Sequence, residues 1–317
     1  MISIAVGMLM LLMSGSINWR LCAPIALPRA GYAAGAVGHR LIIAGGSYWT
    51  PVGKKRTPST DAFDPKCRCW LRMASMPEAI SDSASVVVDG KLYVLGGADN
   101  TGSVSDVYLF DGKDWTRRDD LRLPEPRMSG AAVANDHHIY IAGGISAAGN
   151  YSSGLRSVWS IDPRHSEGGW KRLADCPCAT RMSMGAAVLR GRLLLFGGLR
   201  TEGRGQANLA DIWSFDFAKQ QWTLAGTLPE GRRAMWAATI GDQVYLFGGY
   251  TDTFSADILR WHDGAVTRAG TLPDPVADAK VVAIGCHLYT TGGETNIHVR
   301  GSHTWDGALP EFCAEEK

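Results

Sequence analysis

The amino-acid sequence predicts an all-β protein whose four-stranded sheets are arranged in a ring, a six-bladed β-propeller. Three observations predict this fold. An apolar strand ending in a Gly-Gly doublet recurs six times, a run of small residues precedes each of these strands, and the 317-residue chain contains 38 glycines and 11 tryptophans. Frequent glycine turns and large aromatic side chains suit stacked β-sheets, and a ring of this size forms a single domain.

The repeated unit contains four strands. Successive doublets follow one another at nearly constant intervals along the chain. They stand at Gly45-Gly46, Gly96-Gly97, Gly143-Gly144, Gly197-Gly198, Gly248-Gly249 and Gly292-Gly293. After each doublet come a variable polar loop and a further apolar strand. A four-stranded twisted sheet cannot bury both of its faces alone, so we expect the units to stack radially and cover one another.

Small and large side chains have separate places in the unit. The segments before the doublet strands, such as AGYAAGAV, SGAAVA and MGAAV, are rich in alanine and glycine, as expected for the crowded strand nearest the axis. A tryptophan follows in most units, and we interpret it as a wedge between neighbouring sheets rather than as a binding residue. These tryptophans are Trp70, Trp115, Trp170 and Trp222.

The N-terminal segment is expected to close the ring. The sixth unit starts at Asp278 and lacks the tryptophan-containing fourth strand that ends the other units. The segment from Trp19 to Pro28 has the features of such a fourth strand, with no first three strands before it. We therefore predict that residues 17–28 complete the last blade, as ring closure requires.

Residues 1–16 are expected to be a signal peptide that is removed on export. They carry no charged side chain, and their apolar run from Ile2 to Met13 is too short to span a bilayer. An ordinary apolar first strand is the alternative. The expected mature protein, residues 17–317, is a periplasmic or secreted propeller without stable membrane insertion.

The seven cysteines are compatible with export. Because their number is odd, one thiol must stay free or pair between chains. A disulfide between Cys22 and Cys313 would staple the closing blade. The two C-x-C pairs lie far apart in the sequence, which disfavours a shared metal site.

Composition narrows the range of partners. The chain has 32 basic and 31 acidic residues, a formal net charge of +1, and 45% hydrophobic residues. Intrinsic disorder and a broad nucleic-acid surface are both disfavoured, since phosphate binding needs a marked basic excess.

Function is expected in the loops, because the sheets are committed to packing. At one fixed interval before the doublet, four of the six units carry an arginine, namely Arg29, Arg127, Arg181 and Arg232. These arginines would stand at one height beside the central channel, with Arg233 and Lys280 close by and with Asp82 and Asp278 in two units that lack the arginine. Such a cluster suits a small carboxylated ligand held by bidentate contacts. The equal alternative is that each arginine pairs with an acid or a carbonyl of the neighbouring blade.

The loops after the doublets hold the remaining candidates. Aromatic faces beside polar side chains suit a sugar ring, which indicates Trp49 and Tyr250, and Arg200 could bind a carboxylate. Only the sixth unit places an acid, Glu294, directly after the doublet, whereas the fourth unit carries Glu202 farther along its loop. For each of these residues, an ordinary solvated loop side chain is the alternative interpretation.

Taken together, the six units with a Gly-Gly doublet and a downstream tryptophan resemble kelch repeats, which implies a six-bladed propeller. Within that group, the stretch ILRWHDGAVTRAGTLPD after Asp257, followed by LYTTGGE, resembles the exported bacterial sialic acid mutarotases, also called N-acetylneuraminate epimerases. In that family the proton acceptor is a glutamate directly after the doublet of a middle blade. Here Leu199 stands at that place, and Glu202 lies nearby.

The resemblance implies acid–base interconversion of the anomers of an acidic sugar. Glu294 or Glu202 would accept the proton, the arginines would hold the substrate carboxylate, and neither a metal nor a nucleotide cofactor is needed. The alternative is a non-catalytic kelch module that binds a glycan or a protein on the same face. A copper radical oxidase would need a Tyr/His/Cys copper site on a longer chain, and convincing Asp-box repeats of sialidases are not seen in the sequence.

Overall fold

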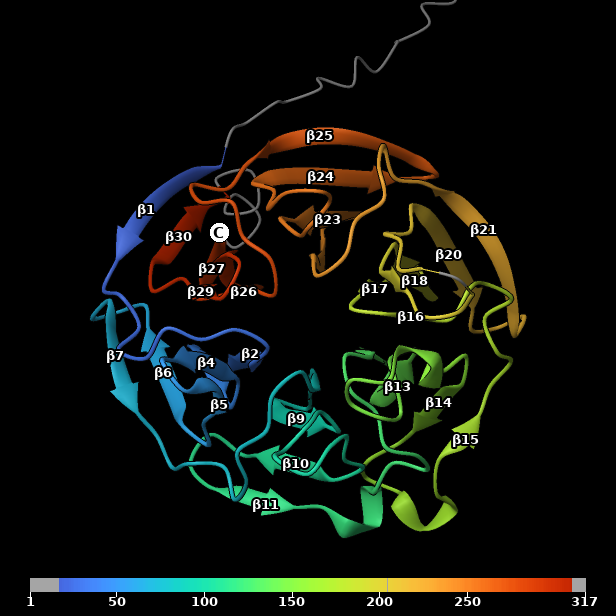
Figure 1. Cartoon of the computed structure of the whole chain (residues 1–317), viewed down its shortest axis with the longest axis horizontal. Helices are drawn as coiled ribbons and strands as arrows, with labels where there is room; N and C mark the ends of the chain where they lie inside the picture. Colours follow the sequence, from blue (N-terminus) through green and yellow to red (C-terminus); the bar gives the residue numbers. More distant parts are fainter. Residues whose placement is uncertain (1–16, 204, 310–317) are drawn as a thin grey trace, which may run out of the picture.

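The computed structural model describes residues 17–203 and 205–309 and contains six four-stranded antiparallel sheets arranged in a ring (Figure 1). Each sheet is one blade, and the blades are numbered by the order of their innermost strands along the chain. This arrangement confirms the predicted all-β, six-bladed propeller.

The first three blades follow one another along the chain. From the axis outward, blade 1 contains β2 (Ala33–Val37), β3 (Arg40–Ala44), β6 (Thr60–Asp64) and β7 (Cys69–Arg72). Blade 2 contains β8 (Ala84–Val88), β9 (Lys91–Leu95), β10 (Val107–Phe110) and β11 (Trp115–Arg117). Blade 3 contains β12 (Ala131–Asn135), β13 (His138–Ala142), β14 (Val158–Ile161) and β15 (Lys171–Arg172).

The remaining blades repeat the pattern, except that the last takes its outer strand from the N-terminal segment. Blade 4 contains β17 (Gly185–Leu189), β18 (Arg192–Phe196), β20 (Asp211–Asp216) and β21 (Gln221–Thr227). Blade 5 contains β22 (Trp236–Ile240), β23 (Gln243–Phe247), β24 (Asp257–His262) and β25 (Ala265–Thr271). Blade 6 contains β26 (Lys280–Ile284), β27 (His287–Thr291), β30 (Thr304–Ala308) and β1 (Asn18–Cys22).

The loops between the blade strands contain short strands and 3₁₀ helices. Three two-stranded pairs are formed by β4 (Ser47–Thr50) with β5 (Gly53–Arg56), β16 (Arg181–Met182) with β19 (Leu199–Arg200), and β28 (Glu294–Asn296) with β29 (Val299–Arg300). Three single-turn 3₁₀ helices are η1 (Asp119–Leu121), η2 (Tyr151–Ser153) and η3 (Ser166–Gly168). Within the described residues, no helix has the length and apolar character needed to cross a membrane.

The ring is closed by β1, as the sequence predicts. β1 pairs antiparallel with β30, from Asn18 opposite Ala308 to Cys22 opposite Thr304. Figure 1 shows the blue N-terminal strand lying along the red C-terminal blade. The first described strand of the chain is therefore held against the last.

The glycine doublets join each blade to the next. The first glycine of each doublet has a positive φ and touches the backbone that enters the next blade: a Cβ on Gly96 would lie 2.3 Å from the carbonyl oxygen of Arg127. The N–H of the second glycine, Gly97, donates to that same oxygen at 2.7 Å. Only glycine combines this conformation with so close an approach, which explains why the doublet recurs.

The repeated tryptophans lie between neighbouring blades, as predicted. The indole Nε1 of Trp115 in blade 2 donates at 3.0 Å to the carbonyl oxygen of Ala74, which follows the last strand of blade 1. Trp222 in blade 4 makes the same contact with Ala174 at 2.8 Å. Each ring therefore packs at a sheet interface while its one polar atom is satisfied.

Both C-x-C pairs form disulfides, Cys67–Cys69 and Cys176–Cys178. Cys22 is buried and forms no disulfide with another described cysteine, and its Sγ accepts a hydrogen bond from Arg68 at 2.9 Å. Its predicted partner, Cys313, lies outside the described residues, as does the predicted signal peptide.

Candidate functional site

A central channel runs between the innermost strands and encloses a cavity of about 490 Å³. Its wall is built mainly from the small side chains of β2, β8, β12, β17, β22 and β26. Small residues keep the channel open because larger side chains would fill the space around the axis. The volume is in the range of small-molecule sites.

A ring of six equivalent residues surrounds this cavity. Each lies two positions before an innermost strand, has a positive φ and lines the channel: Gly31, Asp82, Ser129, Ser183, Ala234 and Asp278. Backbone hydrogen bonds of 2.7 to 2.9 Å connect neighbours, for example from the N–H of Asp82 to the carbonyl oxygen of Gly31. All six positions thus share the left-handed backbone conformation, and they differ only in the side chain that each presents to the channel.

Two of the six ring positions carry carboxylates. Asp82 and Asp278 belong to blades 2 and 6, on either side of Gly31 in blade 1. A Cβ on Gly31 would lie 2.4 Å from Oδ1 of Asp82, so glycine leaves room for that side chain. The resulting acidic edge of the channel is the chemically distinctive part of the ring.

Asp278 is the perturbed acid of this edge. Its burial inside the channel, followed by the negative charge of Asp82, raises its pKa to about 6, although Lys280 opposes the change. Glu294 raises the pKa of Asp278 further and Arg300 lowers it. A carboxyl group that titrates near neutral pH inside a cavity can both accept and return a proton.

Lys280 stands beside this acid at the start of β26. Burial lowers its pKa, while Asp278 and Asp82 act in the opposite direction. Its Nζ lies 4.4 Å from the centre of the Trp236 ring, and its backbone N–H donates to the hydroxyl of Tyr32 at 3.1 Å. The ammonium group is therefore held in the channel by a cation–π contact.

Hairpins from blades 1 and 6 border the same acidic edge. Lys54 in β5 lies 3.4 Å from Oδ2 of Asp82, which connects the first hairpin to the ring. The rings of Trp49 in β4 and His298 are 3.9 Å apart, so the two hairpins contact each other. Glu294 in β28 pairs with Arg300 in β29 at 2.6 Å.

The four predicted arginines do not line this channel. Their exposed fractions are 0 to 2%, and none of them borders the cavity. Each guanidinium turns into its own blade and pairs with a carboxylate there: Arg29 with Asp61, Arg127 with Glu125, Arg181 with Asp211, and Arg232 with Glu230 and Asp257. Their shared register positions the backbone carbonyls that receive the doublet N–H groups, so the expected cationic mouth requires correction.

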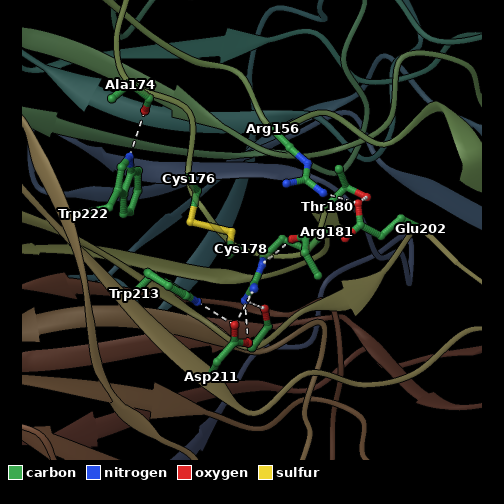
Figure 2. Close-up of a disulfide and its surroundings, with 12 residues drawn as sticks. Arg156, Ala174, Cys176, Cys178, Thr180, Arg181, Glu202, Asp211, Trp213 and Trp222 are labelled. Carbon is green, nitrogen blue, oxygen red and sulfur yellow. Dashed lines mark hydrogen bonds and ion pairs between the residues drawn. A yellow bond between two sulfur atoms is a disulfide. The ribbon is translucent and has the colours of Figure 1, made fainter.

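Arg181 illustrates this structural role. It donates two hydrogen bonds to the carboxylate of Asp211, of 2.9 and 2.7 Å, and Trp213 Nε1 donates to the same group at 2.6 Å (Figure 2). Burial opposes the ionised form of Asp211, but these contacts outweigh it and keep its pKa below the ordinary value. This is the geometry of a buried, bidentate ion pair.

Glu202 lies away from the acidic edge. Figure 2 shows it turned toward Arg156 and Thr180, and its Oε2 is 2.6 Å from Nη2 of Arg156. That hydrogen bond lowers the pKa of Glu202, which makes it a weak proton acceptor at neutral pH. Leu199, at the place of the expected glutamate, is buried against Ile145 and Met182.

The other predicted loop residues are spread over several blades. Tyr250 follows the blade 5 doublet, where the guanidinium of Arg233 lies 4.4 Å from the centre of its ring. Arg200 in β19 pairs along the backbone with Arg181. Of the predicted set, Glu294 and Trp49 therefore lie in the hairpins beside the acidic edge, whereas Glu202, Arg200 and Tyr250 belong to other blades.

The sequence places Asp278, Asp82 and Lys280 near the channel but does not mark them as site residues. Their register could have identified the two acids. The ring position lies at a constant interval before each doublet, and only the second and sixth units place an acid there, Asp82 and Asp278. Neither the burial of Asp278 nor its proximity to Asp82 follows from spacing within one repeat.

Comparison with known proteins decides the family. A sequence profile of the KLHDC2/KLHL20/DRC7 kelch-repeats domain matches residues 17–198, more than half of the chain, and a kelch motif profile matches residues 180–229. The chain belongs to the kelch-repeat family. The propeller with its glycine doublets is accordingly a kelch propeller.

Relatives of this kelch protein have varied names. It is 29% identical to kelch-like protein terF of Aspergillus terreus over 72% of the chain and 51% of that protein. It is 25% identical to N-(sulfonatooxy)prop-2-enimidothioate sulfolyase of Thlaspi arvense over 71% of each. The chain spans about half of terF and 26% of mouse kelch-like protein 35, which it matches at 30% identity over 52% of the chain.

A solved structure has the same fold. The structure of YjhT superposes with a TM-score of 0.73, covering 89% of this chain and 95% of that one at 16% sequence identity. At this identity the likeness establishes the fold alone. Any activity must therefore be argued from the channel residues themselves.

Proposed function

We propose that the kelch propeller binds a small acidic sugar at the acidic edge of its channel and interconverts the two anomers by proton transfer. The observation that carries the proposal is Asp278, a carboxyl group with a pKa of about 6 on the wall of a 490 Å³ cavity. The resemblance of the fifth and sixth units to the mutarotases supports the substrate class. It also directs attention to blade 6, which contains Asp278.

The reaction needs one proton acceptor and one proton donor. Opening the sugar ring removes a proton from the anomeric hydroxyl and delivers one to the ring oxygen, and closing the ring on the other face reverses both steps. Ionised Asp278 accepts the first proton, and the Lys280 ammonium donates the second. A carboxyl group with a pKa near the working pH is well matched to reversible transfer. No metal or nucleotide takes part in this proposal.

Binding of the substrate carboxylate falls to the lysines. Lys280 lines the cavity, and Lys54 approaches Asp82 at the same edge. The four buried arginines are already paired with acids. Glu294 pairs with Arg300 and raises the pKa of Asp278, so we assign it a role in tuning that acid.

Anomeric exchange measured by proton NMR tests the proposal. A freshly dissolved single anomer of N-acetylneuraminate should equilibrate faster with the protein than in buffer, and the Asp278→Asn variant should lose most of this acceleration, about 100-fold or more. Ser129→Ala is the matched control, because it changes the equivalent ring position of blade 3 to the alanine that blade 5 carries. Full activity of Asp278→Asn would rule out Asp278 as the acceptor.

A non-catalytic binding module is the second candidate. The tips of the two hairpins expose apolar side chains, with Val52 83% and Ile297 67% accessible. Such residues beside a channel mouth favour contact with a protein or a glycan. If the parent protein shows no exchange above the buffer rate, this function replaces the first.

We also propose that the chain is exported and loses residues 1–16. The apolar, uncharged start of the sequence and the two disulfides support a periplasmic or secreted location. Mass spectrometry of the protein from its native compartment should give an N-terminus near Ile17. A chain that retains Met1 would contradict this location.

A further inference from the structure

Blade 6 contains a second cavity, of about 260 Å³, that shares no lining residue with the channel. Its wall includes Asp274, Val276, Gly292, Arg300, His303 and Trp305. The proposed sugar chemistry makes no use of this space. Its origin becomes clear when blade 6 is compared with the blades that carry a buried arginine.

Val276 occupies the register position of those arginines. In blades 3, 4 and 5 the arginine donates to the carbonyl oxygen of the first doublet glycine; Arg181 reaches Gly197 at 2.9 Å, and Arg232 reaches Gly248 at 3.0 Å. The corresponding glycine of blade 6 is Gly292, which lines the cavity. Valine is too short to reach it, so the place of the guanidinium is left open.

The acid that accompanies the arginine is retained. Arg127 pairs at 2.7 Å with Glu125, two residues before it in the sequence, and Arg232 pairs with Glu230 in the same way at 3.0 Å. Two residues before Val276 stands Asp274, whose side chain lines the cavity. Blade 6 therefore has the carboxylate but lacks the arginine that pairs with the equivalent carboxylate in blades 3 and 5.

The tryptophan that accompanies the acid is retained as well. In blade 3, Trp159 Nε1 donates to Glu125 at 3.1 Å. In blade 6, Trp305 Nε1 donates to Oδ2 of Asp274 at 2.7 Å, and His303 Nδ1 lies 2.8 Å from the same oxygen. The carboxylate is thus fixed in position by its neighbours, which reduces the cost of ordering it around a ligand.

Two charged side chains line this cavity, those of Asp274 and Arg300. The side chain of Arg300 is only 8% exposed and also borders the cavity, but its Nη1 lies 2.6 Å from Oε1 of Glu294, which compensates its charge. Glu294 lies outside the lining, and Asp274 is the lining carboxylate for which the described residues supply no arginine or lysine partner. We propose that the blade 6 cavity binds a guanidinium group supplied by a ligand, in the place where other blades use their own arginine.

Binding of methylguanidinium tests this proposal, with uncharged methylurea as the shape-matched control. Titration at pH 8 should shift the indole N–H signal of Trp305 in nitrogen-proton NMR spectra, with a Kd in the millimolar range for so small a probe. Methylurea should cause little shift. Absence of a methylguanidinium-dependent shift would overturn the proposal, as would tighter binding of acetate, which would assign the cavity to anions on Arg300.

Two variants locate the site. Val276→Arg should fill the cavity with a guanidinium of its own, abolish methylguanidinium binding and melt at or above the parent temperature. Asp274→Asn should weaken binding at least tenfold, because a charge-assisted hydrogen bond is lost. Unchanged affinity in a folded Val276→Arg protein would contradict the proposal, and if that variant fails to fold, unchanged affinity in Asp274→Asn does so. Asp278→Asn should bind like the parent, which separates this site from the channel.

The source of the guanidinium can be distinguished with larger probes. Agmatine carries the group on a small free molecule, whereas acetyl-Gly-Arg-Gly-amide presents it as an arginine side chain between peptide bonds. Tighter binding of agmatine than of the peptide would indicate a metabolite, and the reverse would indicate an arginine side chain of a protein partner. Failure of both to compete with methylguanidinium would contradict the site.

Discussion

Asp278 brings a functional requirement into conflict with stability. Its backbone belongs to a ring of left-handed residues that all six blades share, so its conformation reflects the architecture. Its side chain is exceptional, because burial and the neighbouring charge of Asp82 raise its pKa to about 6. A carboxyl group that is harder to ionise in the folded protein than in the unfolded chain weakens the fold whenever it is ionised.

The Asp278→Asn variant should therefore be more stable than the parent at neutral pH. The folded parent holds the Asp278 proton up to about pH 6, whereas the unfolded chain releases it near pH 4, so this group lowers stability as the pH rises from about 4 to 6. Asparagine has no such proton and tolerates the left-handed conformation. We expect a gain of the order of 1–3 kcal/mol at pH 7–8.

Urea unfolding of the two proteins at several pH values checks this expectation. The difference in unfolding free energy should shrink as the pH falls from 6 toward 4, because the unfolded parent also begins to hold the Asp278 proton there. A difference that does not vary between pH 4 and 8 would mean that Asp278 titrates normally. The same pKa predicts that anomeric exchange by the parent rises through about pH 6, as the acceptor becomes ionised.

At the residue scale, the sequence predicts which residues share a position in the blades but not which way their side chains turn. A constant register before the doublet correctly groups Arg29, Arg127, Arg181 and Arg232, but register fixes height along the axis and not the direction of a side chain. The backbone carbonyls of these arginines face the neighbouring doublets, while their guanidinium groups turn into their own blades. The register also places Asp82 and Asp278 at the same height, but only closure of the ring brings blades 6, 1 and 2 together around them.

At the scale of the blade, the buried arginine joins the strands of one sheet. Arg181 lies in β16, just before β17. Its guanidinium donates to the carbonyl oxygen of Gly197, which follows β18, and to the carboxylate of Asp211 at the start of β20. Such an ion pair costs desolvation when it forms, yet removing one partner leaves the other charge without compensation. The arginine recurs in the sequence because it stabilises the blade. An anion-binding site would produce the same repeated arginine, so the sequence pattern does not distinguish the two roles.

Replacing this arginine should destabilise the protein. Arg181→Met keeps much of the apolar side-chain volume but leaves Asp211 unpaired, and we expect a loss of about 3 kcal/mol in unfolding free energy. Arg192→Met in the same blade is the matched control. Arg192 is half exposed and 3.8 Å from Asp216, so its loss should cost less than about 1 kcal/mol.

Chemical unfolding measures both changes, and sugar binding by the folded variants should remain that of the parent. If Arg181→Met retains parental stability but loses binding, the arginines act as ligands after all.

The contact between the two hairpins could not be predicted from the repeats. The sequence identifies Trp49 and Glu294 as loop residues, but the contact of Trp49 with His298 joins blades at opposite ends of the chain.

At the scale of the whole molecule, stability depends on closing the ring. Each blade covers its neighbour through apolar side chains, doublet hydrogen bonds and tryptophans, so an open ring would expose two sheet faces. Closure was predictable because the fourth-strand pattern missing from the sixth unit appears at Trp19. The seam is reinforced across blades: Arg68 of blade 1 lies 3.0 Å from Asp306 of blade 6, and Trp70 donates to the carbonyl oxygen of Ala23.

Removal of the closing segment should therefore destabilise every blade and not only the last one. We expect the protein lacking residues 1–28 to melt well below the protein lacking residues 1–16, because β30 then loses its outer antiparallel partner β1 and keeps only β27. Differential scanning calorimetry compares the two truncations, which differ only by the closing segment. Addition of a synthetic peptide of residues 17–28 should restore part of the loss, since a ligand that binds only the folded state stabilises it. Equal melting temperatures of the two truncated proteins would mean that the ring does not need β1 for its stability.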